Sequence, residues 1–156
     1  MIIENKQGKG DIMKICFDMD GTIANFYGVN GWLEYLQNFD DTPYRQAKPL
    51  LRMSSFARVL NRLQRQGYEI CIISWLSKCS CDEFDIKVTQ TKIEWLHKHL
   101  PSVQWDEIHI IEYGSPKEQF CNDFDDILFD DEYNNRKNWI GQAFDVDCIM
   151  DILKEL

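Results

Sequence analysis

The sequence predicts an α/β protein in which helices cover a parallel sheet, and two patterns carry this prediction. Short apolar stretches typical of buried strands alternate along the chain with longer stretches of helical periodicity. Alternation of this kind favours parallel strands joined by helical crossovers. A length of 156 residues and a hydrophobic content of 44% agree with one domain around a sizeable core. The expected strands lie near residues 13–17, 68–74, 107–112, 126–130 and 143–146.

The N-terminal segment, residues 1–12, is expected to be a flexible tail, because it is polar and does not read as a targeting peptide. One domain is expected to span residues 13–156. No long apolar stretch occurs in the sequence, so we expect a soluble, cytoplasmic protein without membrane contact. The six cysteines are expected to be reduced thiols, since Cys79-Ser80-Cys81 lacks the spacing of a zinc site.

The first strand, near residues 13–17, stops at two carboxylates, Asp18 and Asp20, and Gly21 and Thr22 then supply a turn. In open α/β sheets, ligands bind beyond the carboxyl ends of the strands. Two acids at this place, without an Arg or Lys in the same loop, repel each other unless a cation or a shared proton relieves the repulsion. The pair therefore indicates an active site. The alternative is a turn whose acids cap the next helix.

Residues 23–52 are expected to contain a short amphipathic helix and a loop bracketed by Pro43 and Pro49. Four residues mark the helix: Trp32, Leu33, Tyr35 and Leu36. Aromatic side chains of this segment, such as Phe26 and Tyr27, are either core residues or a surface on which a nucleobase can stack.

A helix over residues 55–66, ended by Gly67, leads into the second strand. Ser74 lies at the carboxyl end of that strand and is followed by Trp75. A serine at such a place is also an ordinary turn residue.

The next helix, over residues 87–100, carries Lys92 on what reads as an ordinary amphipathic face. After the third strand, Lys117 follows the turn Gly114-Ser115-Pro116. Lysines are usually solvated surface charges, so position alone does not give either lysine a role.

The fourth strand stops at Asp130 and Asp131. A second strand that ends in paired acids rarely serves packing alone, so this pair is expected at the same site as the first. The alternative, an acidic loop on an acidic protein, applies to Asp123, Asp125 and Glu132.

The pattern Asp18-Met19-Asp20-Gly21-Thr22, followed along the chain by Ser74, Lys117 and Asp130-Asp131, resembles the haloacid dehalogenase (HAD) superfamily of aspartate-nucleophile phosphatases. The resemblance implies a three-layer, Rossmann-like α/β fold whose parallel sheet has the strand order 3-2-1-4-5. It also implies a small helical cap around residues 23–52 that covers the site.

By this resemblance, Asp18 attacks phosphorus to form an aspartyl-phosphate, while Asp20 protonates the leaving oxygen and then deprotonates the attacking water. Ser74 is the residue that matches a hydrogen-bond donor to the phosphoryl group. Lys117 matches the lysine that neutralises nucleophile and phosphate, with Lys92 as a substitute.

The resemblance also implies a Mg²⁺ cofactor, held by Asp18, by the backbone carbonyl of Asp20 and by Asp130 or Asp131. The sequence leaves open which of the last two binds the metal. Further expected contacts to substrate are Gly21, Thr22 and Trp75.

Within the superfamily, residues 18–26 and 128–135 together with Trp139 look most like the 5'(3')-deoxyribonucleotidase branch. The expected activity is Mg²⁺-dependent hydrolysis of small phosphomonoesters, with nucleoside monophosphates as substrates. A polynucleotide 3'-phosphatase, a phosphotransferase and a non-catalytic Mg²⁺- or nucleotide-binding module stay open as alternatives.

Charge favours a small anionic substrate over a long nucleic acid, because a net charge of −9 disfavours a polymer of phosphates. Residues 42–68 nevertheless contain no acid and six basic residues: Arg45, Lys48, Arg52, Arg58, Arg62 and Arg65. This basic segment is either a solvated face or, in a polynucleotide 3'-phosphatase, the lining of a groove that leads to Asp18. A homodimer is left open.

Overall fold

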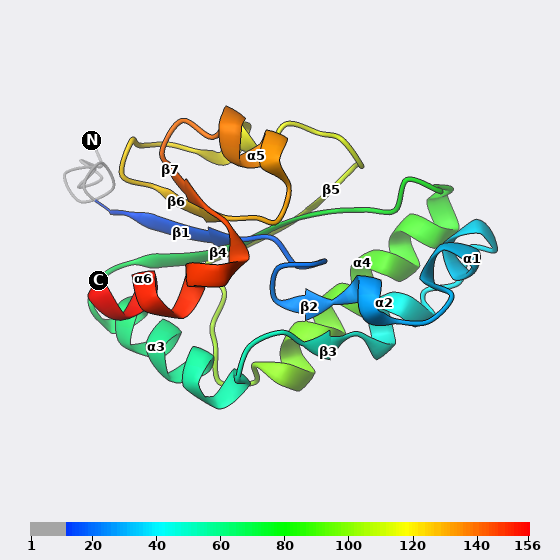
Figure 1. Cartoon of the computed structure of the whole chain (residues 1–156), viewed down its shortest axis with the longest axis horizontal. Helices are drawn as coiled ribbons and strands as arrows, with labels where there is room; N and C mark the ends of the chain where they lie inside the picture. The colour runs from blue at the N-terminus through cyan, green and yellow to red at the C-terminus, as the bar shows by residue number, and fades with distance from the viewer. Residues whose placement is uncertain (1–11) are drawn as a thin grey trace, which may run out of the picture.

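A five-stranded parallel sheet runs through the molecule (Figure 1). The computed structural model describes residues 12–156, so the expected tail lies outside the described residues except for Ile12. Each strand lies within two residues of its expected position at both ends. The strands are β1 (Lys14–Phe17), β4 (Glu69–Trp75), β5 (Glu107–Ile111), β6 (Ile127–Phe129) and β7 (Gln142–Phe144).

The order of the strands is β5-β4-β1-β6-β7, and every neighbouring pair is parallel. Counted along the chain, this order is 3-2-1-4-5, so the predicted topology is confirmed. The order reverses at β1, which pairs with β4 on one side and with β6 on the other. Phe17 lies opposite Phe129 in the β1–β6 pair, so the residues that follow them leave the sheet side by side. Ligands of open α/β sheets bind at such a switch point.

Strand side chains alternate between two buried layers, because neighbouring residues of a strand point to opposite faces of the sheet. Phe17 and Phe129 belong to the larger apolar cluster, while Cys16 and Leu128 belong to the smaller one with Trp139. Both faces are covered, so the strands are apolar along most of their length. Three helices cover the first face and one the second (Figure 1): α3 (Met53–Arg65), α4 (Asp82–His99) and α6 (Ile149–Glu155) against α5 (Tyr133–Asn138).

Two helices begin earlier than the sequence predicts. Helix α4 begins at Asp82 rather than at residue 87, and its first turn carries three acids, Asp82, Glu83 and Asp85. Acidic side chains interact favourably with the positive end of the helix dipole, which explains the longer helix. Helix α3 begins at Met53 rather than at residue 55. Within residues 12–156, no helix is long and apolar enough to cross a bilayer.

Between β1 and α3, the chain leaves the sheet and forms a small layer beside α4 (Figure 1). We call residues 24–49 the cap segment. The expected loop between Pro43 and Pro49 is wrong in part, because Pro43 lies in the first turn of a helix, where proline is well tolerated. The elements of the segment are β2 (Ala24–Asn25), the 3-10 helix η1 (Phe26–Gly28), α1 (Trp32–Gln37), α2 (Thr42–Gln46) and β3 (Lys48–Pro49).

The cap segment is anchored to α4 by one buried carboxylate. Asp41 is 3% exposed and accepts hydrogen bonds from Thr91 Oγ1 at 2.6 Å and from Arg45 Nη1 at 2.8 Å. Burial of Asp41 raises its pKa, but these hydrogen bonds outweigh burial and hold the pKa below the ordinary value of 3.8. Apolar contacts add to this anchor: Phe26, Leu36 and Tyr44 pack with Phe84 and Val88 of α4.

Replacement of the anchor, Asp41→Ala, is expected to lower the free energy of unfolding by ~2 kcal/mol, because the buried Thr91 hydroxyl loses its acceptor. Urea denaturation followed by tryptophan fluorescence measures the change. Glu94→Ala, at an exposed acid in the middle of α4, is the matched control and is expected to have little effect. Equal stabilities of the two variants would show that Asp41 does not hold the cap segment.

Candidate active site

The carboxyl ends of β1 and β6 bring three carboxylates together. The backbone N–H of Asp18 donates to the Phe129 carbonyl at 2.9 Å, which continues the β1–β6 pairing by one residue. One carboxylate oxygen from each of Asp18, Asp130 and Asp131 lies within 4.8 Å of the other two. The convergence follows from strand order and register, since residues 17 and 129 are paired.

Gly21 and Thr22 shape this cluster from the loop after β1. Gly21 has a φ of +78°, and a Cβ built on it would lie 2.5 Å from Asp131 Oδ2, so a side chain there would displace the carboxylate. The buried Thr22 hydroxyl lies 3.1 Å from Asp18 Oδ2 and 3.2 Å from Asp131 Oδ1. Both residues face the acids rather than the neighbouring cavity, and their contact with substrate stays a prediction.

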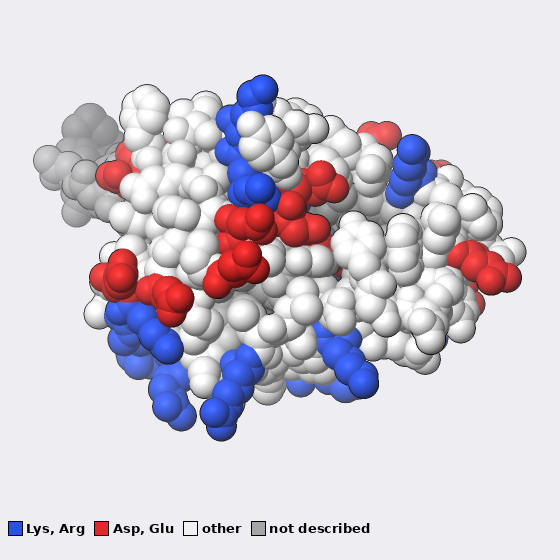
Figure 2. All heavy atoms as spheres, viewed as in Figure 1, with Lys and Arg blue, Asp and Glu red and all other residues white. Residues whose placement is uncertain are grey.

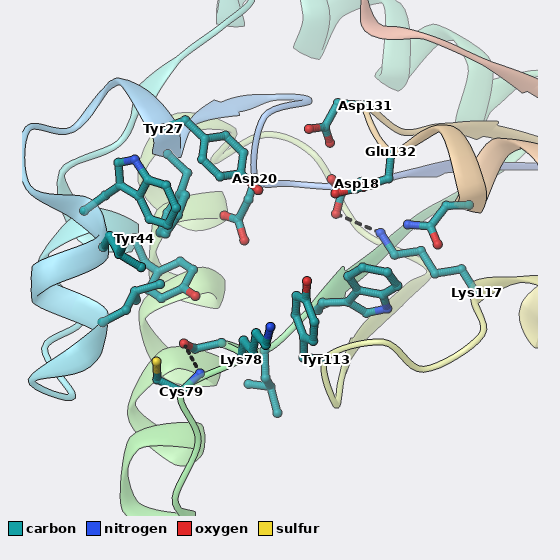
Figure 3. A pocket seen from close by; sticks show the side chains of 18 residues that line it. Asp18, Asp20, Tyr27, Tyr44, Lys78, Cys79, Tyr113, Lys117, Asp131 and Glu132 are labelled. Carbon is teal, nitrogen blue, oxygen red and sulfur yellow. Dashed lines mark hydrogen bonds and ion pairs between the residues drawn. The ribbon is translucent and has the colours of Figure 1, made fainter.

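Lys117 supplies the positive charge of the cluster. It begins the 3-10 helix η2 (Lys117–Phe120), and its Nζ donates to Asp18 Oδ1 at 2.9 Å (Figure 3). The same Nζ donates to Asp130 Oδ2 at 2.7 Å. Burial lowers the pKa of Lys117, but the charges of Asp18 and Asp130 outweigh burial and raise the pKa above 10.5. The ammonium is therefore charged at neutral pH, and it has a third N–H beyond the two that these carboxylates accept.

The acids outnumber the lysine, and their pKa values reflect this. Burial first, and then the charge of Asp18, raises the pKa of Asp130 to about 6 and that of Asp131 to about 8. If all three carboxyls ionise, as they do around a bound cation, they exceed the single ammonium by two negative charges. An all-oxygen cluster with this excess fits a hard divalent cation such as Mg²⁺.

The two acids after β6 differ in how many donors they already have. Asp130 accepts from Lys117, from Asn135 Nδ2 at 3.1 Å and from the Glu132 backbone N–H at 2.9 Å. The Thr22 hydroxyl lies 3.2 Å from Asp131 Oδ1, and among residues 12–156 no donor reaches Asp131 Oδ2. Of these two acids, Asp131 is therefore the one with an oxygen that no donor occupies and that a metal can bind.

Asp20 lies at the same edge of the sheet, but its carboxylate is bound by a second lysine, Lys92. Lys92 Nζ donates to Asp20 Oδ2, to Ser74 Oγ and to the Trp75 carbonyl, each at 2.7 Å. Ser74 is fully buried under Lys92, so its contact with a phosphoryl group stays a prediction. The interpretation of Lys92 as part of an ordinary amphipathic face is wrong, because its side chain is 1% exposed and points into the site.

An apolar cavity of about 230 Å³ opens beside Asp18 and Asp20. Its walls come from the cap segment on one side and from the loops after β4 and β5 on the other; Figure 3 shows Tyr27 and Tyr44 facing Tyr113 across this space. Trp75 lines the cavity, where its Nε1 donates to the Ser115 carbonyl at 2.9 Å. The Lys117 ammonium lies 5.2 Å from the Trp75 ring centroid. The Trp75 ring therefore contacts the lysine of the acidic cluster and also forms part of the cavity wall.

Tyr44 is the part of residues 42–68 that lines the cavity, and none of the six basic residues of this segment does so. Among the described residues, the basic ones that line it are Lys117 and Lys78. Figure 2 shows basic side chains along the edge of the molecule where α3 lies, while acidic side chains gather in the middle of that view. Within residues 12–156, the cavity beside Asp18 therefore lacks the lining of basic side chains from this segment that a polynucleotide 3'-phosphatase would be expected to have.

The sequence interpretation missed the parts that Lys92, Tyr44, Tyr113 and Asn135 play in the site. A signal existed for Lys92, because it lies four residues after Val88 and four before Leu96, on the stripe of α4 that is buried. A lysine on an apolar stripe indicates a buried partner. The two tyrosines carried no such signal, since each reaches the cavity only through the packing of distant segments.

Without metal, the crowded acids are expected to make the protein less stable as the pH rises from about 4 to about 8. Asp131 has a pKa of about 8 in the folded protein against an ordinary 3.8. A raised carboxyl pKa stabilises the fold fully below the ordinary value, and this contribution is lost as the pH rises through about 8. The difference in Tm between the native protein and Asp131→Asn, measured from pH 4 to pH 8, isolates the contribution of the Asp131 carboxyl. A difference that does not change with pH would contradict the crowding of Asp131.

Comparison with known proteins supports the fold. No family model and no curated protein sequence matches the chain. Among solved structures, it is similar to a D,D-heptose 1,7-bisphosphate phosphatase from Burkholderia thailandensis, with a TM-score of 0.54 and 14% identity over 92% of this chain and 97% of that chain. At this identity, the likeness concerns the fold alone. The chain therefore has the predicted α/β, HAD-like fold.

Proposed function

We propose that the protein is a Mg²⁺-dependent phosphatase that hydrolyses small phosphomonoesters through an aspartyl-phosphate on Asp18. The observation that carries the proposal is the buried Lys117 between Asp18 and Asp130, at the switch point of the sheet and open to a cavity. An ionised carboxylate needs no activating base to attack phosphorus. The third N–H of Lys117 can then donate to the phosphoryl group that Asp18 receives.

Asp20 is the proposed acid and base. It lines the cavity two residues from the nucleophile, within reach of a leaving oxygen. Burial raises the pKa of Asp20 above 3.8 in spite of the nearby Lys92, and the charge of Asp18 acts in the same direction. A raised pKa favours the protonated carboxyl that must release a proton when the P–O bond breaks. The carboxylate that results can accept a proton from the water that hydrolyses the aspartyl-phosphate.

Asp18, Asp131 and the backbone carbonyl of Asp20 are the proposed ligands of Mg²⁺. We favour Asp131 over Asp130, because Asp130 already accepts three hydrogen bonds and Asp131 Oδ2 has no donor among the described residues. Bound magnesium supplies positive charge that lets an anionic phosphate approach a carboxylate. Thr22 keeps two of these carboxylates in place through its hydroxyl.

The aromatic walls support nucleoside monophosphates as the substrate class. A flat base can lie between the rings of the cap segment and the Trp75–Tyr113 pair, whose centroids are 5.1 Å apart. A polynucleotide is a poorer fit, because none of the basic residues of the segment 42–68 lines the cavity. A non-catalytic binding module is also disfavoured, since Asp18, Asp20 and Lys117 are all in place.

Phosphate release with Mg²⁺ tests the proposed function. The panel contains deoxynucleoside and ribonucleoside monophosphates, a sugar phosphate and a 3'-phosphorylated oligonucleotide. Release from the monophosphates, lost when EDTA removes the metal, is the expected result. Binding of Mg²⁺ without release from any substrate would favour the binding module, and release from the oligonucleotide alone would favour the polynucleotide 3'-phosphatase.

Trp75→Ala is expected to raise KM for nucleoside monophosphates by about fivefold, because a stacked ring contributes roughly 1 kcal/mol. Trp75→Phe is the matched control, since it keeps a ring beside Lys117. The measurement compares KM for a nucleotide with KM for glycerol phosphate, which has no ring to stack. Equal losses on both substrates would contradict a base-binding role for Trp75.

A further inference from the structure

The site contains two buried lysines, and they are engaged differently. Lys117 donates to two carboxylate oxygens and keeps one N–H for a ligand. Lys92 has all three of its N–H groups engaged, by Asp20 Oδ2, Ser74 Oγ and the Trp75 carbonyl, each at 2.7 Å. An ammonium has three donors, so Lys92 has none left for a phosphate. Any role of Lys92 in the reaction must therefore be exerted through the groups to which it is hydrogen-bonded.

Three groups accept hydrogen bonds from Lys92. Among them, Asp20 is the one with a carboxylate, and this carboxylate lines the cavity. Ser74 is fully buried, whereas the Asp20 side chain is 18% exposed and lines the cavity. Lys92 binds Oδ2 of Asp20, and no donor among residues 12–156 reaches the other oxygen, Oδ1. The buried ammonium thus fixes one carboxylate oxygen and leaves the second one open to the cavity.

The surroundings make this contact strong and rigid. The Lys92 side chain is 1% exposed, and its Nζ lies 4.9 Å from the ring centroid of Tyr44, a buried residue of the cap segment. Exclusion of water strengthens a charge-assisted hydrogen bond. Thr91, the preceding residue of α4, binds Asp41 of the cap segment. One turn of α4 therefore holds both the cap segment and Asp20.

We propose that Lys92 is a positioning residue that aims Asp20 at the leaving group of the substrate. This role rests on the proposed phosphatase function. When an Asp18 oxygen forms its bond to phosphorus, the bond from phosphorus to the leaving oxygen breaks, and the electron pair stays on that oxygen. Asp20 Oδ1 gives its proton to the leaving oxygen, while Oδ2 remains bound to Lys92. Lys117 thus binds the nucleophile, Asp18, and Lys92 binds the acid, Asp20.

The test uses substrates that differ in their need for a proton. Lys92→Met keeps the length of the side chain but removes the ammonium. For an alkyl phosphate, whose leaving oxygen must be protonated, kcat/KM is expected to fall about 100-fold, the lower range of general acid catalysis. For 4-nitrophenyl phosphate, which leaves without a proton, the fall is expected to be about fivefold or less. The parameter kcat/KM is used because it reports the steps up to departure of the leaving group.

A double-mutant cycle separates positioning from a merely structural role. In an Asp20→Asn background, Lys92→Met is expected to cause no further loss of kcat/KM, since the group that it aims is already inactive. A structural role would cause the same loss in both backgrounds and overturn the proposal. Lys92→Gln, which keeps a donor, is expected to lie between the native protein and Lys92→Met, and it serves as the second variant should Lys92→Met not fold.

Lys98→Met is the matched control, because Lys98 is an exposed lysine of the same helix. It is expected to leave both substrates unaffected. Equal losses of Lys92→Met on the alkyl and nitrophenyl substrates, in an active native protein, would overturn the role of Lys92 alone. A native protein that releases phosphate from no substrate would overturn the phosphatase function and this role together.

Discussion

Asp18→Asn is expected to lower phosphate release on the order of 10⁴-fold or more, because an amide cannot serve as the anionic nucleophile. The replacement has the same shape as Asp18, and its amide oxygen can still accept from Lys117, which lies 2.9 Å from Asp18 Oδ1. The fold should therefore persist. Release is measured at saturating substrate and Mg²⁺, and the thermal transition is followed by circular dichroism.

Asp125→Asn is the control for this loss, because Asp125 is an exposed acid in the loop before β6. It is expected to retain the native rate. A rate for Asp18→Asn within tenfold of the native protein, with the fold intact, would exclude Asp18 as the nucleophile.

Lys117→Met is expected to affect stability as well as activity. Turnover should fall on the order of 10³-fold, since one of the preorganised positive charges at the phosphoryl group is lost. Asp18 and Asp130 would remain buried without their cation, which is expected to lower the free energy of unfolding by ~3 kcal/mol at neutral pH in the absence of Mg²⁺. Urea denaturation at neutral and at acidic pH measures this loss. The loss should shrink in acid, because protonation removes the uncompensated charge of Asp130, whose pKa is about 6 in the native protein.

Lys137→Met, at an exposed lysine of α5, is the control and should change neither quantity. A stability of Lys117→Met equal to that of Lys137→Met at neutral pH would show that the buried ion pairs are not maintained in solution. A normal rate would show that Lys117 does not neutralise the phosphoryl group.

The sheet and the meeting of the acids could be predicted because both follow from local sequence. Each core strand is a short apolar run, and the two runs that end in paired acids, at Asp18 and Asp130, lie next to each other once crossovers wind outward from β1. Register then brings residues 17 and 129 opposite each other, and the acids follow. This part of the site can be predicted without knowledge of side-chain packing.

The environment of the acids could not be predicted in the same way. Asp20 and Lys92 are 72 residues apart in the sequence, and their contact depends on how α4 is rotated against β4. The beginning of α4 at Asp82 depends on the favourable interaction of its first-turn acids with the helix end, which the spacing of apolar residues does not report. Side chains from separate segments form the cavity walls, so no single window of sequence contains them.

The most direct test of the mechanism is to trap the phosphorylated protein. Radiolabelled 4-nitrophenyl phosphate, whose leaving group departs without a proton, is mixed with Asp20→Asn, in which loss of the base should let the intermediate accumulate, and the reaction is quenched in acid. We expect label on the peptide that contains Asp18, and no label when Asp18→Asn is combined with Asp20→Asn. Phosphate release by the native protein with no labelled peptide at any time would contradict an aspartyl-phosphate on Asp18.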